Sequence, residues 1–168
     1  IIVTSDHAQV APAHTPPLAG DMCACLNYGL LGELGYTVLK KDENGNDIRE
    51  IDWSKTRAVQ QQGNDIFINL KGRNSGRGIV DPADQYELEE QIMTDLYSVK
   101  DEKTGHRVIA LALRNKDAVL LGYGGPECGD ICYWIAEGYN IDHADGLSTT
   151  YGECETSLSP IFVAAGKG

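Results

Sequence analysis

The sequence predicts an α/β fold, in which helices cover the faces of a sheet. Two observations carry this prediction. Residues 64–72, 107–114 and 130–138 are short runs rich in apolar residues without strict alternation, as in strands that are buried on both faces. Residues 82–97 instead place apolar side chains at helical spacing. Strands of the first kind need amphipathic helices of the second kind to cover them.

The first third of the chain predicts a strand, a loop, a helix and a hairpin, in that order. Residues 1–7, IIVTSDH, have the β-branched apolar start of a buried strand. Residues 8–21 are rich in proline and predict a loop, because X-Pro steps resist helix. Residues 25–36 predict a short helix that ends at Gly35. In residues 36–53 the stretch ENGND is a turn signal between two strand-like runs, which indicates a hairpin.

The clearest strand, residues 64–72, is followed by a loop and then by the helix at 82–97. Asp81 suits the N-cap of this helix and Pro82 its first turn. The predicted apolar face of the helix consists of Tyr86, Ile92, Met93, Leu96 and Tyr97.

After this helix the sequence predicts a turn at residues 100–107 and a strand at 107–114. A glycine-rich loop at 121–130 then leads into the strand at 130–138. This loop lacks the Gly-Lys-Ser/Thr ending of a P-loop and indicates a tight turn, with Asp130 leading the next strand in. A long irregular segment at 139–157 precedes a last buried strand within 159–168.

Length and charge limit the classes of function. A chain of 168 residues is long enough for one domain with a sizeable core. The formal net charge is −11 and no basic stripe is present, which argues against a surface for polymeric nucleic acid. No apolar run approaches the ~20 residues that cross a bilayer, so no membrane segment is expected. An acidic protein can still bind a small anion through metal cations.

The five cysteines predict buried or unpaired thiols. Their odd number argues against a complete disulfide framework. Cys23 and Cys25 are separated by one residue and Cys128 and Cys132 by three, without the turn residues of a zinc ribbon. Free thiols favour a reducing compartment, and nothing else in the sequence indicates a location.

Two places carry side chains suited to a metal. Asp6 and His7 lie together at the end of the first predicted strand, and His143 lies between Asp142 and Asp145 in a polar loop. A carboxylate beside imidazoles is a good ligand set for zinc or a similar cation. The competing interpretation is that Asp6 caps a turn and both histidines are surface residues.

Taken in order, three stretches resemble a known family. TSDH at residues 4–7, the segment from DIFINLKGR to HRVI at residues 65–109, and SPIFVAAGKG at residues 159–168 resemble the type I phosphodiesterase/nucleotide pyrophosphatase family of the alkaline phosphatase superfamily. This resemblance implies that residues 1–168 form a single partial domain. Its fold would be part of an alkaline-phosphatase-like sheet with covering helices.

The resemblance also implies a site. The family hydrolyses phosphate esters with two metal ions, commonly zinc, which stabilise the attacking and leaving oxygens. Asp6 and His7 match the Asp-His metal ligands, and His143 matches a later histidine. Ala8 and Ala144 stand where the family usually has glycine. A rival alignment places Tyr151 and Gly152 at the later histidine position, which would remove that ligand.

Several functional expectations follow from this resemblance. The family nucleophile matches no residue here and is expected upstream, so this piece is expected to be inactive alone and to bind metal weakly. The expected substrate of the whole enzyme is a small phosphate ester, and Lys71 and Arg73 either neutralise its phosphate or are solvated. A phosphomonoesterase, phosphomutase or sulfatase of the superfamily, or a degenerate binding domain without catalysis, are alternatives. The sequence gives no oligomeric state.

Overall fold

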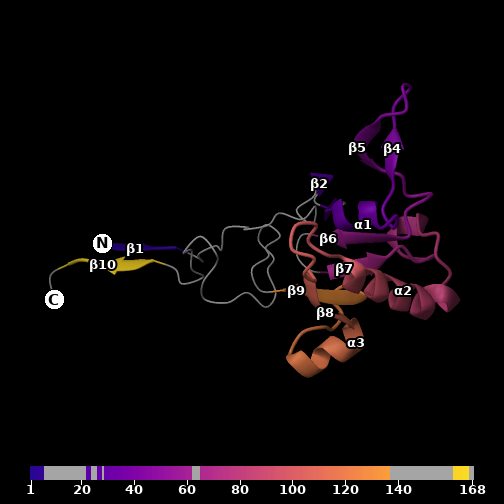
Figure 1. Ribbon diagram of the computed structural model, residues 1–168. Helices are drawn as coiled ribbons and strands as arrows, with labels where there is room; N and C mark the ends of the chain where they lie inside the picture. Colours follow the sequence, from indigo (N-terminus) through magenta and orange to yellow (C-terminus); the bar gives the residue numbers. More distant parts are fainter. Residues whose placement is uncertain (6–21, 24–25, 28, 62–64, 137–160, 167–168) are drawn as a thin grey trace.

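The structure is a computed structural model that describes residues 1–5, 22–23, 26–27, 29–61, 65–136 and 161–166 (Figure 1). Its described elements combine three antiparallel sheets with a few short helices and one long one. The predicted combination of helices and strands in an α/β fold is therefore confirmed, and the sheets are antiparallel. None of the helices in these residues is long and apolar enough to span a membrane.

The largest sheet has six strands in the spatial order β2-β3-β6-β7-β9-β8, and each pairs antiparallel with its neighbours. In chain order these strands are β2 (Met22–Cys23), β3 (Leu26–Asn27), β6 (Ala58–Gln61), β7 (Asp65–Ile68), β8 (Ile109–Arg114) and β9 (Ile131–Ile135). Because neighbouring strands run in opposite directions, their carboxyl ends do not gather at one edge. A ligand crevice at a shared carboxyl edge therefore does not exist in this sheet.

Two helices close the main core against this sheet. Helix α1 (Gly29–Glu33) contributes Leu30 and Leu31, and helix α2 (Gln85–Ser98) contributes Leu88, Ile92 and Leu96. They pack with alternate strand residues that share one face of the sheet, among them Ile66, Ile68, Ile131, Tyr133 and Ile135.

The long helix begins as the sequence predicts. The 3₁₀ turn η3 (Pro82–Asp84) precedes α2, and the Asp81 carboxylate accepts a hydrogen bond from the Ala83 amide at 3.0 Å. This bond is the main reason that the pKa of Asp81 lies below its ordinary value. The predicted apolar face is wrong at Tyr86, which is 60% exposed, because Leu88 takes the core position instead.

The predicted hairpin is present as β4 (Leu39–Lys41) and β5 (Asp47–Ile51). Asp42 organises its turn by accepting hydrogen bonds from the Asn44 and Asn46 amides, each at 2.8 Å. A small second core joins the hairpin to the other face of the main sheet, through Ile51, Val59 and the partly buried side chains Leu39, Trp53 and Phe67.

Short helical turns occur in the loop that follows β7 and directly after β8. The 3₁₀ turn η2 (Asn74–Gly76) lies in the loop after β7, and Ser75 within it has a left-handed backbone with φ 56°. Helix α3 (Asn115–Ala118) and the 3₁₀ turn η4 (Val119–Leu121) follow β8 and lead into the glycine-rich loop. The predicted loops at 72–84 and 121–130 are thus largely confirmed, with added helical turns.

The remaining two strands pair with each other and form what we call the ribbon, residues 1–5 and 161–166. β1 (Ile2–Thr4) runs antiparallel to β10 (Phe162–Ala164), with Val3 opposite Val163. Both strands occur where the sequence predicts strands. The prediction that they are buried is wrong in this structure, because Ile2 is 69% and Phe162 is 68% exposed. In Figure 1 the ribbon lies apart from the six-stranded sheet.

Candidate functional site

The three residues predicted as metal ligands, Asp6, His7 and His143, lie outside the described residues. The structure does describe Ser5 and Ile161, the strand ends from which the segments with these three residues continue. The Ser5 amide donates a hydrogen bond to the Ile161 carbonyl at 3.1 Å, one step beyond the β1–β10 register. The chain continues from Ser5 directly to Asp6, and the segment with His143 enters the ribbon at Ile161. Both segments therefore join the same end of the ribbon.

Within the described part of the chain, no group of three or more His, Cys, Asp or Glu side chains is arranged to hold a metal ion. His106 is exposed in the turn that follows Asp101. His14 lies outside the described residues.

Each of the basic residues in the loop after β7 has a protein partner. Lys71 Nζ lies 3.5 Å from an Asp81 carboxylate oxygen, and its side chain is 58% exposed. The guanidinium of Arg77 lies over the Trp53 ring, 5.7 Å from its centroid. Lys71 thus fits the prediction of a solvated surface residue better than that of a phosphate ligand.

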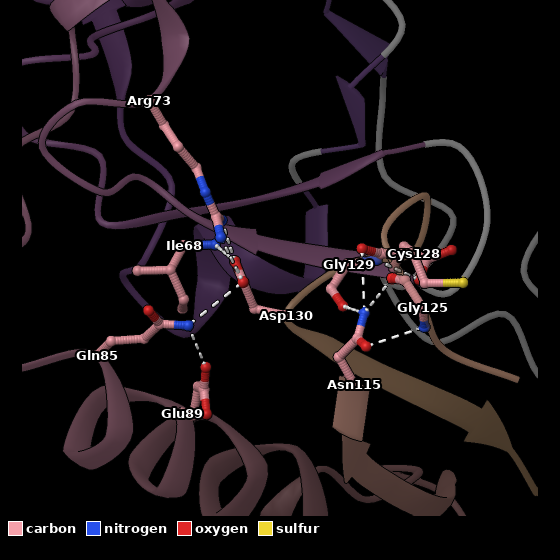
Figure 2. Close-up of polar contacts among 10 residues, drawn as sticks. Ile68, Arg73, Gln85, Glu89, Asn115, Gly125, Cys128, Gly129 and Asp130 are labelled. Carbon is pink, nitrogen blue, oxygen red and sulfur yellow. Dashed lines mark hydrogen bonds and ion pairs between the residues drawn. The ribbon is translucent and has the colours of Figure 1, made fainter. Parts of the chain in front are cut away.

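Arg73 forms the most specific ion pair of this region, with Asp130 at the start of β9 (Figure 2). Its two terminal nitrogens donate to the two carboxylate oxygens at 2.6 and 2.9 Å. Such a bidentate pair is strong and directional. The hydrogen bond to Asp130 is the main reason that the pKa of Arg73 is raised. The Arg73 side chain remains 43% exposed beside this pair, which fits the prediction of a solvated residue.

Asp130 joins several elements at once. Besides Arg73, its carboxylate accepts hydrogen bonds from the Ile68 amide at 2.8 Å and from the Gln85 side chain at 3.3 Å (Figure 2). The Asp130 side chain is only 10% exposed. The carboxylate therefore connects the end of β7, the loop that carries Arg73, the first turn of α2 and the start of β9.

The polar network continues along α2 into a cavity of about 360 Å³. Gln85 donates to a Glu89 carboxylate oxygen at 2.6 Å, and Arg114 Nε donates to the other at 3.0 Å. The Arg114 guanidinium also lies 3.9 Å from the centroid of the Tyr86 ring. Both carboxylates that line this cavity, Glu89 and Asp130, are thus paired with arginines.

Asn115 closes the glycine-rich loop (Figure 2). Its amide nitrogen donates to the carbonyls of Gly125 and Gly129 at 2.8 and 2.7 Å, and its oxygen accepts from the Gly125 amide at 2.9 Å. A Cβ at Gly124 would lie 2.4 Å from the Asn115 carbonyl oxygen, so the loop also needs glycine there. The loop is a tight turn before β9, as the sequence predicts.

Two cysteines with described side chains, Cys128 and Cys132, are free thiols. Burial raises the pKa of Cys132 to about 12, and the charge of Asp65, whose carboxylate lies 3.5 Å from the sulfur, adds to this shift. Because a thiolate is needed for nucleophilic attack and for metal binding, we expect Cys132 to react slowly near neutral pH. The prediction of buried or unpaired thiols is confirmed for these two residues.

This assignment predicts a difference in thiol reactivity. With iodoacetamide at pH 8, we expect Cys132 to be alkylated at least about tenfold more slowly than the half-buried Cys128, since the Cys132 thiol stays protonated well above this pH. Site-resolved mass spectrometry of the labelled peptides measures both rates. In a denaturant the two rates should converge. Equal rates in the native protein would contradict the assignment.

Sequence reasoning did not find the Asp130–Arg73 pair, since the two residues are 57 positions apart. The available signal was local: an aspartate directly before an apolar strand, and an arginine in a glycine-rich loop after another strand. Comparison with known proteins adds no assignment, because no family model, curated protein or solved structure matches the chain.

Proposed function

We propose that this chain carries part of the two-zinc site of a phosphoric ester hydrolase related to the type I phosphodiesterases of the alkaline phosphatase superfamily. Asp6 and His7 would bind zinc, and His143 would join them. The substrate would be a small phosphate ester, on which the two metals stabilise the attacking and leaving oxygens. The resemblance of residues 4–7, 65–109 and 159–168 to this family supports the proposal.

One structural observation supports the proposal. The hydrogen bond from Ser5 to Ile161 brings together the two points where the candidate segments join the ribbon. Asp6 and His7 follow Ser5 immediately, so β1 fixes where their backbone begins. The residues between Ser5 and Ile161 thus leave and re-enter the ribbon at one end, where the proposed site would lie.

Zinc binding tests the proposal on the chain itself. We expect the 168-residue chain to bind zinc weakly, and we expect Asp6→Asn or His7→Gln to lower its affinity at least about tenfold, because each removes a ligand. A chelator-competition titration at pH 7.5 measures the affinity. The matched controls are Asp84→Asn and His106→Gln, which make the same changes at exposed described positions.

The cysteines remain unchanged in all four variants, so any zinc that they bind is a common background. The same titration on His143→Gln decides between the two alignments of the later histidine. An affinity that falls no further in Asp6→Asn and His7→Gln than in the two controls would contradict the proposed site.

A further inference from the structure

The ribbon joins two parts of the chain that are far apart in sequence. The amino group of Ile1 donates to the Ala165 carbonyl at 2.6 Å, and the Ala165 amide donates back to the Ile1 carbonyl at 2.9 Å. At the other end the Ser5 amide bonds Ile161. The hydrogen bonds named here connect β1 with β10, so each strand is the other's partner over its whole described length.

The ribbon shares no core with the rest of the described chain. Its larger apolar side chains are more than half exposed, namely Ile1, Ile2, Val3, Ile161, Phe162 and Val163. All the buried apolar side chains of the described residues instead belong to the stretch from Leu30 to Ile135. Burial of apolar surface is the main stabilising contribution to folding, so the two parts are stabilised separately.

The described residues from Met22 to Ala136, which we call the insert, have what an independent unit needs. They contain the six-stranded sheet, α1 and α2 with the main core, and the Asp130 network that connects distant loops. One residue on the free edge of β8 is also bonded from within the insert. The Tyr97 hydroxyl accepts from the Ala112 amide at 2.8 Å and donates to the Ala112 carbonyl at 3.2 Å. The core and these edge contacts lie within the insert, and none of them involves the ribbon.

We propose that the insert is an autonomous folding unit placed between two neighbouring strands of a second unit, to which β1 and β10 belong. The chain leaves the second unit after β1, folds the insert, and returns to the same strand pair at β10. This inference does not depend on the hydrolase activity or on zinc. It states that the stability of the insert is independent of the ribbon pairing.

Tryptophan fluorescence of the whole chain tests this independence. The chain has two tryptophans, Trp53 and Trp134, and both lie in the insert. Val3→Pro disrupts the ribbon, since proline is not tolerated within a paired strand. We expect the thermal midpoint followed by fluorescence to stay within about 1 °C of wild type. Ile92→Ala, which empties a fully buried position in the insert core, should lower this midpoint by at least about 5 °C.

Amide hydrogen exchange provides the second readout. In Val3→Pro, the amides of β6, β7, β8 and β9 should keep their wild-type protection. Phe162→Pro, on the opposite strand of the ribbon, should behave in the same way.

A fluorescence midpoint that falls in the ribbon variants as far as in Ile92→Ala would overturn the inference. Failure of both ribbon variants to yield a folded insert would overturn it as well. The zinc site would remain possible in either case, because the titration of Asp6 and His7 variants is a separate measurement.

Discussion

Replacing Asp130 by alanine is expected to lower the free energy of unfolding by about 3 kcal/mol. The change removes a carboxylate that accepts hydrogen bonds from Arg73, Gln85 and the Ile68 amide in a site where the Asp130 side chain is 10% exposed. The loss of the Ile68 bond matters most, since a backbone amide in the interior is left without its acceptor. Arg73 is 43% exposed, so water compensates part of its own loss.

Chemical denaturation followed by tryptophan fluorescence measures this effect. Asp84→Ala is the matched control, because Asp84 is exposed and its side chain makes no cap hydrogen bond to α2. We expect Asp84→Ala to change the free energy of unfolding by less than about 0.5 kcal/mol. A difference of less than about 1 kcal/mol between the two variants would show that the network contributes little to stability.

Gly78→Ala is expected to destabilise the protein by at least about 3 kcal/mol. A Cβ at this position would lie 1.7 Å from the Leu70 carbonyl oxygen and 2.2 Å from its carbon, so the backbone itself must move. The close approach arises because the loop folds back on the end of β7. The Lys71 amide bonds the Val80 carbonyl at 2.8 Å, and the Val80 amide bonds Asn69 at 3.0 Å.

Gly32→Ala serves as its control. The nearest atom to a Cβ at Gly32, in α1, is the Thr37 carbonyl oxygen at 3.8 Å, which is ordinary contact. Alanine also has the higher helix propensity, so this variant should be neutral or up to about 1 kcal/mol more stable. Denaturation midpoints of the two variants give the comparison. Similar stabilities would mean that the loop adopts another conformation than the one described.

Elements with strong local signals were predictable from the sequence. The ENGND turn fixes the hairpin of β4 and β5, and the Asp81-Pro82 pair fixes the start of the long helix. β7, β8 and β9 were recognisable as apolar runs. These features depend on residues that are close together in the sequence, so the sequence alone predicts them.

Features that depend on residues far apart in the sequence were not predictable. β6 was missed because Gln60 and Gln61 make it look polar, although Gln60 is 1% exposed in the folded sheet. The exposure of β1 and β10 depends on which other parts of the protein pack against them. An apolar run in the sequence does not reveal this. The predicted helix at 25–36 begins later, because Leu26–Asn27 pairs with β6 as β3.

The candidate site divides in the same way. The candidate ligands Asp6, His7 and His143 were identified from their residue types and from the resemblance to a family. Both kinds of information are contained in the sequence. That their two segments start at one end of the ribbon follows from the β1–β10 register, which joins residues more than 150 positions apart. The ion pair between Arg73 and Asp130 could be identified only from the structure, because no local sequence pattern reveals which carboxylate an arginine contacts.

Zinc anomalous diffraction from crystals of the protein grown with zinc tests the proposed metal site most directly. We expect an anomalous peak bonded to an Asp6 carboxylate oxygen and a His7 ring nitrogen at about 2.0–2.2 Å, at the Ser5–Ile161 end of the ribbon. A peak on His143 in the same cluster would complete the predicted set. Zinc bound only by cysteines or by surface carboxylates, with Asp6 and His7 free, would contradict the proposed metal site.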